Sequence, residues 1–260
     1  MNFYVDTLRS LIAAGKLDAK ARTLVVAGGS ADRDALLAAG FTDVTISNLD
    51  TRMIADQFAP YAWSFQDAEA LTYADNEFQQ VIEHAGLHHC ASPHRALTEM
   101  YRVASHAVLA FEARDSALLR FGKLFGLTSD HEVEAVVAHG YAFGGWRNTS
   151  LPNYVYRWSE REVTKVVASY DPTGPIPIDF FYGLRLPTER LSFGSRGKRV
   201  ALTLLALPIR AVFVLAPRQG NEFAFFIAKP KGRFPWIGED RRLDREWLDQ
   251  RYQVPESLQH

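Results

Sequence analysis

This sequence has a single cysteine and no excess of charge of one sign, and we expect no secretory signal in it. Cys90 is the only cysteine among 260 residues, so the chain forms no internal disulfide and no zinc site of the Cys-x-x-Cys kind. The 29 Lys and Arg residues are balanced by 30 Asp and Glu residues, so no overall positive field attracts a nucleic acid backbone. Residues 1–10 lack the basic and then apolar order of a secretory signal, and we expect a cytoplasmic protein.

The chain does have enough apolar sequence for one sizeable core. Of its residues, 47% are hydrophobic, and its length fits a single domain over 1–260. Short apolar runs alternate with amphipathic stretches, a pattern that predicts βαβ units and a doubly wound, mostly parallel α/β sheet covered on both faces. The predicted strands are 23–27, 43–47, one that begins at 81, 107–111, 180–182 and 222–228. The predicted helices are 3–16, 34–40, 93–103, 117–139 and 160–169.

Residues 200–217 form one long, nearly apolar run that is flanked by basic residues and is close to the length of a membrane span. Pro208 and Arg210 interrupt this run, and the strand predicted at 222–228 has to return to the sheet. We therefore expect a buried or substrate-capping helix pair in this segment. Docking on a membrane surface through 200–217 is the alternative.

A glycine-rich turn follows the strand predicted at 23–27. Gly28 and Gly29 allow a ligand to approach the backbone closely, and the N-terminus of the next helix adds N–H donors. The second strand ends near Asn48 and Asp50, about twenty residues beyond the first glycine, where dinucleotide folds place a polar side chain on a ribose hydroxyl. The Gly-x-Gly-x-x-Gly order of a nicotinamide-dependent dehydrogenase is missing, which argues against that class of enzyme.

Three segments, 24–50, 65–104 and 106–116, resemble in order and spacing the motifs of class I S-adenosylmethionine-dependent methyltransferases, in their small-molecule branch. The matching motifs include Asp67-Ala68-Glu69, Leu87-His88-His89 and the Glu-x-x-Arg-Val of 99–103. The resemblance implies a Rossmann-like, seven-stranded sheet whose last strand, at 222–228, is antiparallel. It implies a cofactor-binding core over 20–116 and an acceptor-side, helical capping region over 117–260. It also implies transfer of a methyl group from S-adenosylmethionine to a small molecule.

The resemblance further implies roles for single residues. Asp67 accepts a hydrogen bond from the adenine amino group, the backbone N–H of Ala68 donates one, and His84 and Gly86 line the methionine end. The full implied cofactor set is Gly28, Gly29, Asn48, Asp50, Asp67, Ala68, His84 and Gly86. The glycine turn keeps only the first glycine of the family's acidic-x-Gly-x-Gly-x-Gly pattern in register, and Asn48 stands where the family has an acid. A protein that keeps the fold and the cofactor but has lost turnover is therefore an alternative.

Four histidines lie close to Cys90, and both residue types bind zinc. His84 and His88 would share a face only on a helix, whereas they lie where a strand ends, so we predict no metal site. His88 or His89 can instead act as the base that takes a proton from the acceptor. We expect O-methylation of a small metabolite, with residues 112–158 shaping the choice of acceptor.

Overall fold

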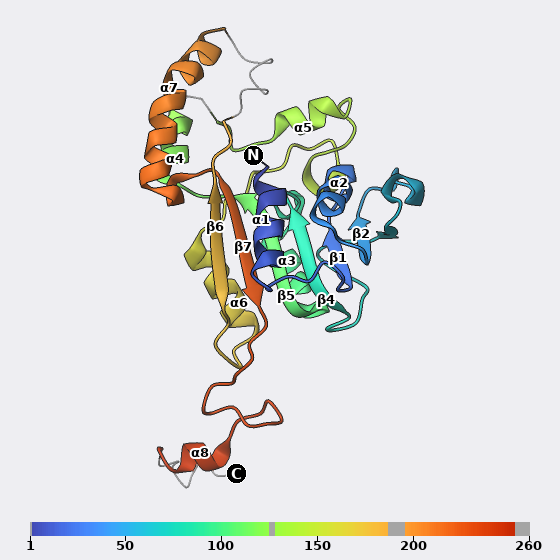
Figure 1. The fold of residues 1–260 in the computed structure, drawn as a ribbon, viewed down its shortest axis with the longest axis vertical. Coiled ribbons are helices and arrows are strands. Elements are labelled where there is room, and N and C mark those ends of the chain that lie inside the picture. The colour runs from blue at the N-terminus through green and yellow to red at the C-terminus, as the bar shows by residue number, and fades with distance from the viewer. Residues whose placement is uncertain (1, 125–127, 187–195, 253–260) are drawn as a thin grey trace.

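A seven-stranded sheet forms the centre of the computed structural model, which describes residues 2–124, 128–186 and 196–252, with the backbone alone over 196–203. The strands lie in the order β3-β2-β1-β4-β5-β7-β6 (Figure 1). Only β7 runs against the others, antiparallel to both β5 and β6, so the doubly wound sheet with a reversed strand at 222–228 is confirmed. The strands are β1 Thr23–Val26, β2 Val44–Asn48, β3 Ala62–Phe65, β4 Phe78–His84, β5 Ala104–Ala113, β6 Ile178–Gly183 and β7 Glu222–Ala228.

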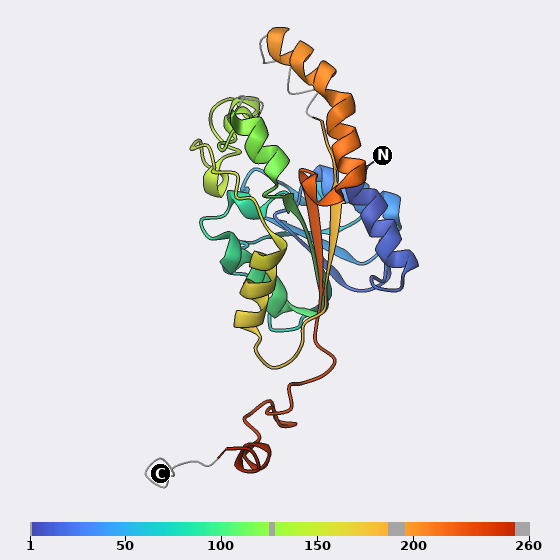
Figure 2. The same cartoon turned by 90° about the vertical axis from the view of Figure 1, so that its left-hand side faces the viewer.

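Helices cover both faces of this sheet (Figure 2). On one face, α1 Phe3–Ala13 and α2 Ser30–Ala39 bury Leu8 and Leu36 against the strands. On the other face, α3 Pro93–Val103 and α6 Glu160–Tyr170 bury Leu97 and Val163. Every residue of β1 is buried, which explains why that strand is a continuous apolar run rather than an alternating one.

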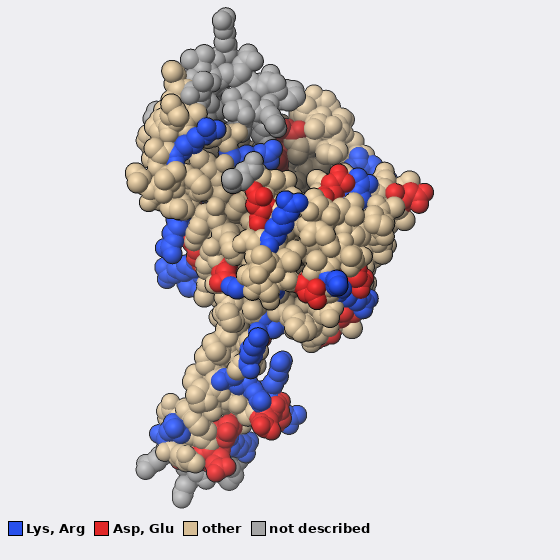
Figure 3. All heavy atoms as spheres, viewed as in Figure 1, with Lys and Arg blue, Asp and Glu red and all other residues tan. Residues whose placement is uncertain are grey.

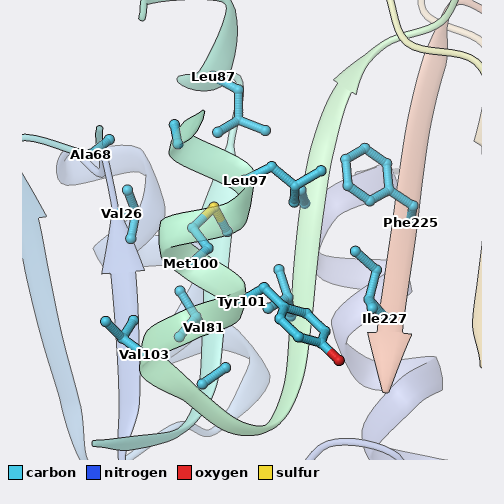
Figure 4. Packing of buried hydrophobic residues seen from close by; sticks show 14 of the residues in the cluster. Val26, Ala68, Val81, Leu87, Leu97, Met100, Tyr101, Val103, Phe225 and Ile227 are labelled. Carbon is cyan, nitrogen blue, oxygen red and sulfur yellow. The ribbon is translucent and has the colours of Figure 1, made fainter. Parts of the chain in front are cut away.

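The helix α3 begins and ends at the predicted residues because its sequence carries clear signals. The Ser92 side chain accepts a hydrogen bond from the N–H of Arg95, and Pro93 occupies the first turn, where its missing N–H costs nothing. Leu97 and Met100 lie between the helix and the strands, as Figure 4 shows, and neither has any exposed surface. The helix is thus held by packing against the sheet as much as by its own cap.

Replacing Leu97 by alanine is expected to lower the free energy of unfolding by about 2–5 kcal/mol, because the packed surroundings cannot close the resulting cavity. Urea denaturation followed by circular dichroism measures this change. Arg95→Ala, on the exposed face of the same helix, is the control and should change stability by about 0.5 kcal/mol or less. Equal effects from the two substitutions would contradict the packing described for α3.

Two elements of the structure differ from the prediction in the first two thirds of the chain. The strand β3 was not predicted, because it is short, lies at the edge of the sheet and has no fully buried residue. The helix predicted over 117–139 is instead two helices, α4 Ala117–Leu124 and α5 Val133–Ala138. The break between them brings the loop before α5 toward the carboxyl edge of the sheet, where it contributes to the site described below.

The prediction of a buried or substrate-capping helix pair at 200–217 is wrong. A single helix, α7 Arg196–Leu215, contains Pro208 within it, and both α7 and α4 lie at the upper end of the molecule (Figures 1 and 2). Between 204 and 215 no side chain is buried, and Leu207 and Leu215 are 76% and 86% exposed. Among the residues that the structure describes, no helix combines the length and apolar character needed to cross a membrane. Beyond β7 the chain leads away from the sheet to α8 Arg245–Asp249.

Candidate functional site

A pocket of about 280 Å³ lies at the carboxyl ends of β1, β2 and β4, the edge at which open parallel sheets bind ligands. The turns after these strands line it, and α5 with the loop 139–148 contributes the remaining wall. Gly28, Gly29, His84 and His88 are predicted site residues that do not line this pocket. Those that do are Asn48, Asp50, Asp67, Ala68, Gly86 and His89.

The glycine turn is tightly tied to the second strand. An added Cβ at Gly28 would lie 2.7 Å from a methyl group of Val25, so only glycine fits there. The Asn48 side-chain amide donates to the Gly28 carbonyl at 3.0 Å, and its oxygen accepts from the N–H of Asp50 at 3.0 Å. Gly29 begins α2, and its N–H donates to the Asp32 carboxylate. Asn48 therefore acts here as a clamp between β2 and the turn.

Asp50 is an ionised carboxylate already paired within the protein. The Arg52 guanidinium donates to both of its oxygens, at 2.9 and 2.5 Å, and these hydrogen bonds lower the pKa of Asp50. The guanidinium of Arg52 in turn lies over the ring of Phe143, 3.7 Å from its centre. This contact connects the turn after β2 to the loop 139–148. Asp50, the residue expected to contact a ribose, thus lines the pocket with both carboxylate oxygens bound by Arg52.

Arg147 spans the part of the pocket that the sequence assigned to adenine. Its guanidinium donates to Asp67 at 2.8 Å and to Glu69 at 2.7 Å, and the contact with Asp67 is the main reason that the pKa of Arg147 is raised. One oxygen of Asp67 is therefore engaged, while the other accepts from the N–H of Glu69. Within the described ranges, no hydrogen bond uses the backbone N–H of Ala68, which leaves it available to a ligand in the pocket.

His84 is the last residue of β4, and Gly86 lies in the turn that follows it; the two residues have different surroundings. The His84 ring stacks on Tyr4 of α1 with ring centres 4.3 Å apart, on the face of the sheet away from the pocket, and burial lowers its pKa. Gly86 lines the pocket, where an added Cβ would lie 2.5 Å from the Cβ of Ala27. Gly86 thus permits the close approach of the turns after β1 and β4, whereas His84 supports α1.

His88 lies between two carboxylates just behind the pocket. It belongs to the short 3-10 helix η2 Leu87–His89, and its Nδ1 lies 2.7 Å from Glu112 and its Nε2 3.2 Å from Glu132. Burial alone would lower the pKa of His88, but the two carboxylates outweigh it and raise the pKa to about 10. In this arrangement the two carboxylates favour the protonated form of His88, which makes His89 the better candidate for the neutral base that the sequence suggested.

His89 has the opposite electrostatic setting. Its ring lines the pocket, and burial together with the neighbouring His88 lowers its pKa, so the ring is neutral near pH 7. Its Nδ1 lies 3.3 Å from the carbonyl oxygen of Gly145, and its Nε2 lies 3.6 Å from Glu132. Of the two predicted catalytic histidines, His89 alone faces the pocket.

Three further residues of the site, Glu112, Glu132 and Arg147, lie within the range 112–158 that we expected to shape the choice of acceptor. Glu112 stands near the end of β5, at the edge of the sheet where an acceptor was expected. Glu132 and Arg147 come from the irregular region between α4 and α6, where no periodic pattern indicates which side chains return to the sheet. Asn153 fixes Glu132 in place, because its carbonyl accepts from the N–H of Glu132 and its side chain donates to the carbonyl of His88.

A second hollow, of about 370 Å³, lies against α4 within the region expected to shape acceptor choice. Its walls combine cationic and aromatic side chains, so it differs in character from the acidic pocket at the strand ends. The residues that line it are Asp115, Leu119, Arg120, Lys123, Tyr154, Tyr156 and Arg157.

Comparison with known proteins identifies the core of this chain. Residues 24–110 match the family described as a methyltransferase domain. No curated protein matches the sequence. Solved structures with a similar fold include an S-adenosylmethionine-dependent methyltransferase from Thermotoga maritima, at 13% identity over 88% of this chain and 90% of that one, with a TM-score of 0.51.

Two further structures extend the comparison. The magnesium protoporphyrin IX methyltransferase from Synechocystis, solved with bound S-adenosylhomocysteine, shares 14% identity over 87% of this chain and 82% of its own, with a TM-score of 0.50. The YcgJ protein from Bacillus subtilis shares 12% identity over 87% and 99%, with a TM-score of 0.53. At these identities the likeness establishes the fold and not the substrate.

Proposed function

We propose that the chain, whose residues 24–110 match the methyltransferase domain family, is a class I S-adenosylmethionine-dependent methyltransferase that methylates a hydroxyl group of a small-molecule acceptor. The observation that carries the proposal is the position of the cluster His88, His89 and Glu132 at one end of the pocket. Asp50 and Asp67 follow β2 and β3, whereas Gly86 and His89 follow β4 on the other side of β1. A cofactor with adenine at Asp67 therefore points its methionine end toward His89.

Methyl transfer to oxygen is the reaction that such a cluster assists. The acceptor oxygen attacks the methyl carbon, the bond from that carbon to sulfur breaks, and S-adenosylhomocysteine leaves as a neutral thioether. In-line positioning supplies most of the acceleration, but a hydroxyl must also lose its proton. A neutral amine attacks through its free electron pair, and its surplus proton can leave after the transfer, so it depends less on such a group. A histidine and carboxylate cluster beside the sulfonium thus favours a hydroxyl acceptor.

For the cofactor itself we assign the predicted residues that line the pocket, which are Asn48, Asp50, Asp67, Ala68 and Gly86, while Gly28 and Gly29 form the turn beside it. The ion pair between Asp67 and Arg147 has to break when adenine binds to Asp67. Both side chains are about one third exposed, so this pair is worth about 1 kcal/mol or less, which a charge-assisted hydrogen bond to the adenine amino group outweighs. His84 leaves this set, because its ring is on the other face of the sheet.

A matched pair of acceptor panels tests the proposal. The purified protein is incubated with methyl-labelled S-adenosylmethionine and with phenols, aliphatic alcohols and the corresponding amines. We expect label on hydroxyl oxygens, and we expect His89→Ala to reduce that transfer by about 100-fold. Label found only on amines would contradict the assignment of a hydroxyl acceptor. Bound cofactor without transfer to any acceptor would favour a protein that has lost turnover.

We further propose that the protein docks on a membrane surface through the exposed face of α7. Leu204, Leu207 and Val214 are each more than 70% exposed, and Leu124 of α4 is 81% exposed. Between 196 and 218 the sequence has five Lys and Arg residues and no Asp or Glu. In Figure 3 the described surface at the upper left is mostly uncharged, with basic side chains on it and beside it. An apolar face flanked by cations fits the surface of an anionic lipid bilayer.

Flotation with vesicles tests this docking. We expect the protein to float with vesicles that contain phosphatidylglycerol and to remain unbound with phosphatidylcholine alone. The double variant L207E/L215E should lose flotation, because it places two carboxylates on the apolar face. The control Tyr252→Glu, at an exposed position of the C-terminal segment, should float like the unchanged protein. Flotation that is equal for all three proteins would contradict docking through α7.

A further inference from the structure

The side chains of His88, His89 and Glu132 converge on one point behind the pocket, where a bound cation would replace the proton on the Nε2 of His88. The Nδ1–H of His88 donates to Glu112, whose side chain is completely buried, and this contact fixes the direction of the ring. The opposite ring nitrogen, Nε2, then faces the carboxylate of Glu132 at 3.2 Å. A buried carboxylate behind a histidine is the usual arrangement that orients a metal-binding imidazole.

The hydrogen bond of His89 to Gly145 determines which ring nitrogen of His89 faces Glu132. Its Nδ1 lies 3.3 Å from the carbonyl oxygen of Gly145, which can only accept, so Nδ1 carries the hydrogen and Nε2 carries an electron pair. That electron pair faces Glu132 at 3.6 Å, too far for a hydrogen bond and with no hydrogen between the two atoms. The same oxygen of Glu132 is paired with His88, and a cation bound between the three side chains would take all of them as ligands.

We propose that His88, His89 and Glu132 bind a divalent transition-metal cation, zinc being the representative case. Zinc lies about 2.0–2.1 Å from nitrogen and oxygen ligands, so the ligand atoms of a tetrahedral site are about 3.4 Å apart. The two distances to Glu132, 3.2 and 3.6 Å, bracket that value, and all three ligand atoms lie within 4.8 Å of one another. Two histidines and one glutamate are a ligand set of catalytic zinc sites, in which the fourth position takes water or substrate.

The sequence pattern missed this site for a definite reason. It tested His84 with His88 as a helical pair, whereas the fold turns His84 to the other face of the sheet. The two ligand histidines are adjacent on η2, and the third ligand comes from 43 residues beyond His89 in the chain. Neighbouring histidines on a 3-10 turn are not a recognised metal spacing, so only the folded chain shows the set.

The metal site deepens the proposed hydroxyl methylation and rests on it. His89 and Glu132 line the pocket, so the fourth coordination position opens toward the acceptor. A hydroxyl oxygen bound there loses its proton to water more readily, because the cation stabilises the oxyanion. The oxygen then attacks the methyl carbon of S-adenosylmethionine, the carbon–sulfur bond breaks, and S-adenosylhomocysteine is released. His89 then acts as a ligand of the cation rather than as the base itself.

Metal binding can be measured without any activity. Tag-free protein is treated with a chelator, dialysed, and titrated with Zn²⁺ by calorimetry and with Co²⁺ by visible absorption. We expect one cation per chain and a Co²⁺ spectrum of a four- or five-coordinate site. His89→Ala and Glu132→Gln should weaken binding by about 100-fold or more, since even changes behind a ligand cost about 10- to 100-fold. His106→Ala, an exposed histidine on the same sheet, is the control.

Two results would overturn the metal site: no binding of either cation to the unchanged protein, or equal binding by the two ligand variants and His106→Ala. Glu132→Gln keeps the shape of a partly exposed loop side chain, so its fold is expected to persist. Titration with S-adenosylmethionine in the presence of chelator separates the two proposals. Cofactor binding that persists while cation binding is absent removes the metal and leaves the methyltransferase pocket.

Discussion

Asp67→Ala is expected to weaken the binding of S-adenosylmethionine by about 10- to 100-fold, because it removes a charge-assisted acceptor for the adenine amino group. The same substitution also frees Arg147, which offsets part of the loss. That offset is small, since a pair whose side chains are 35% and 27% exposed contributes about 1 kcal/mol or less. Calorimetric titration with S-adenosylmethionine measures the difference.

The matched control for this substitution is Asp56→Ala, which removes an exposed carboxylate in the short helix η1 Ala55–Phe58. It should bind the cofactor like the unchanged protein. Arg147→Ala is the informative third variant, because it removes the competitor of adenine for Asp67 and should tighten binding. Unaltered affinity in Asp67→Ala would place the adenine elsewhere than beside Asp67.

Gly86→Ala is expected to reduce both cofactor binding and stability. The added methyl group would meet the Cβ of Ala27 at 2.5 Å, so the turns after β1 and β4 must move apart. Overpacking of this kind costs about 1–3 kcal/mol of unfolding free energy, and the displaced turns form part of the pocket wall. Denaturant unfolding and cofactor titration of the same preparation measure the two effects.

A second substitution should reverse this loss. Ala27 has a positive φ of 54°, a conformation that glycine adopts without strain, so Ala27→Gly alone is expected to be neutral or slightly stabilising. The double variant A27G/G86A moves one methyl group from one turn to the other and should recover most of the lost binding. If the double variant is as weak as Gly86→Ala, the contact between the two turns is not the cause of the loss.

The sequence allowed most of the sheet to be predicted because the buried strands are strongly patterned. The strands β1, β4 and β5 are short apolar runs with turns beside them, and α3 has its own cap in Ser92 and Pro93. The strand β3 lacks such a signal, since none of its side chains is fully buried. Local pattern therefore predicts elements that face the core on both sides and misses those at the edge.

The candidate site was predictable mainly where the sequence resembles methyltransferase motifs. The resemblance implied Asp67, Ala68 and Gly86, and the structure brings them to one pocket. Glu132 and Arg147 reach the same pocket from a region without periodicity, through contacts more than forty residues distant in the chain. His88 shows a different limit, because its charge depends on Glu112 and Glu132, and no local pattern reports such partners. The exposed face of α7 was expected only under the alternative of membrane docking, because apolar sequence alone predicts burial.

Titration of the purified protein with S-adenosylmethionine and with S-adenosylhomocysteine tests most directly that the pocket at the carboxyl ends of β1, β2 and β4 is a methyl-donor site. We predict saturable binding of one molecule per chain with a dissociation constant in the micromolar range for both compounds. The absence of detectable binding of either compound to protein that is folded by circular dichroism would contradict the account.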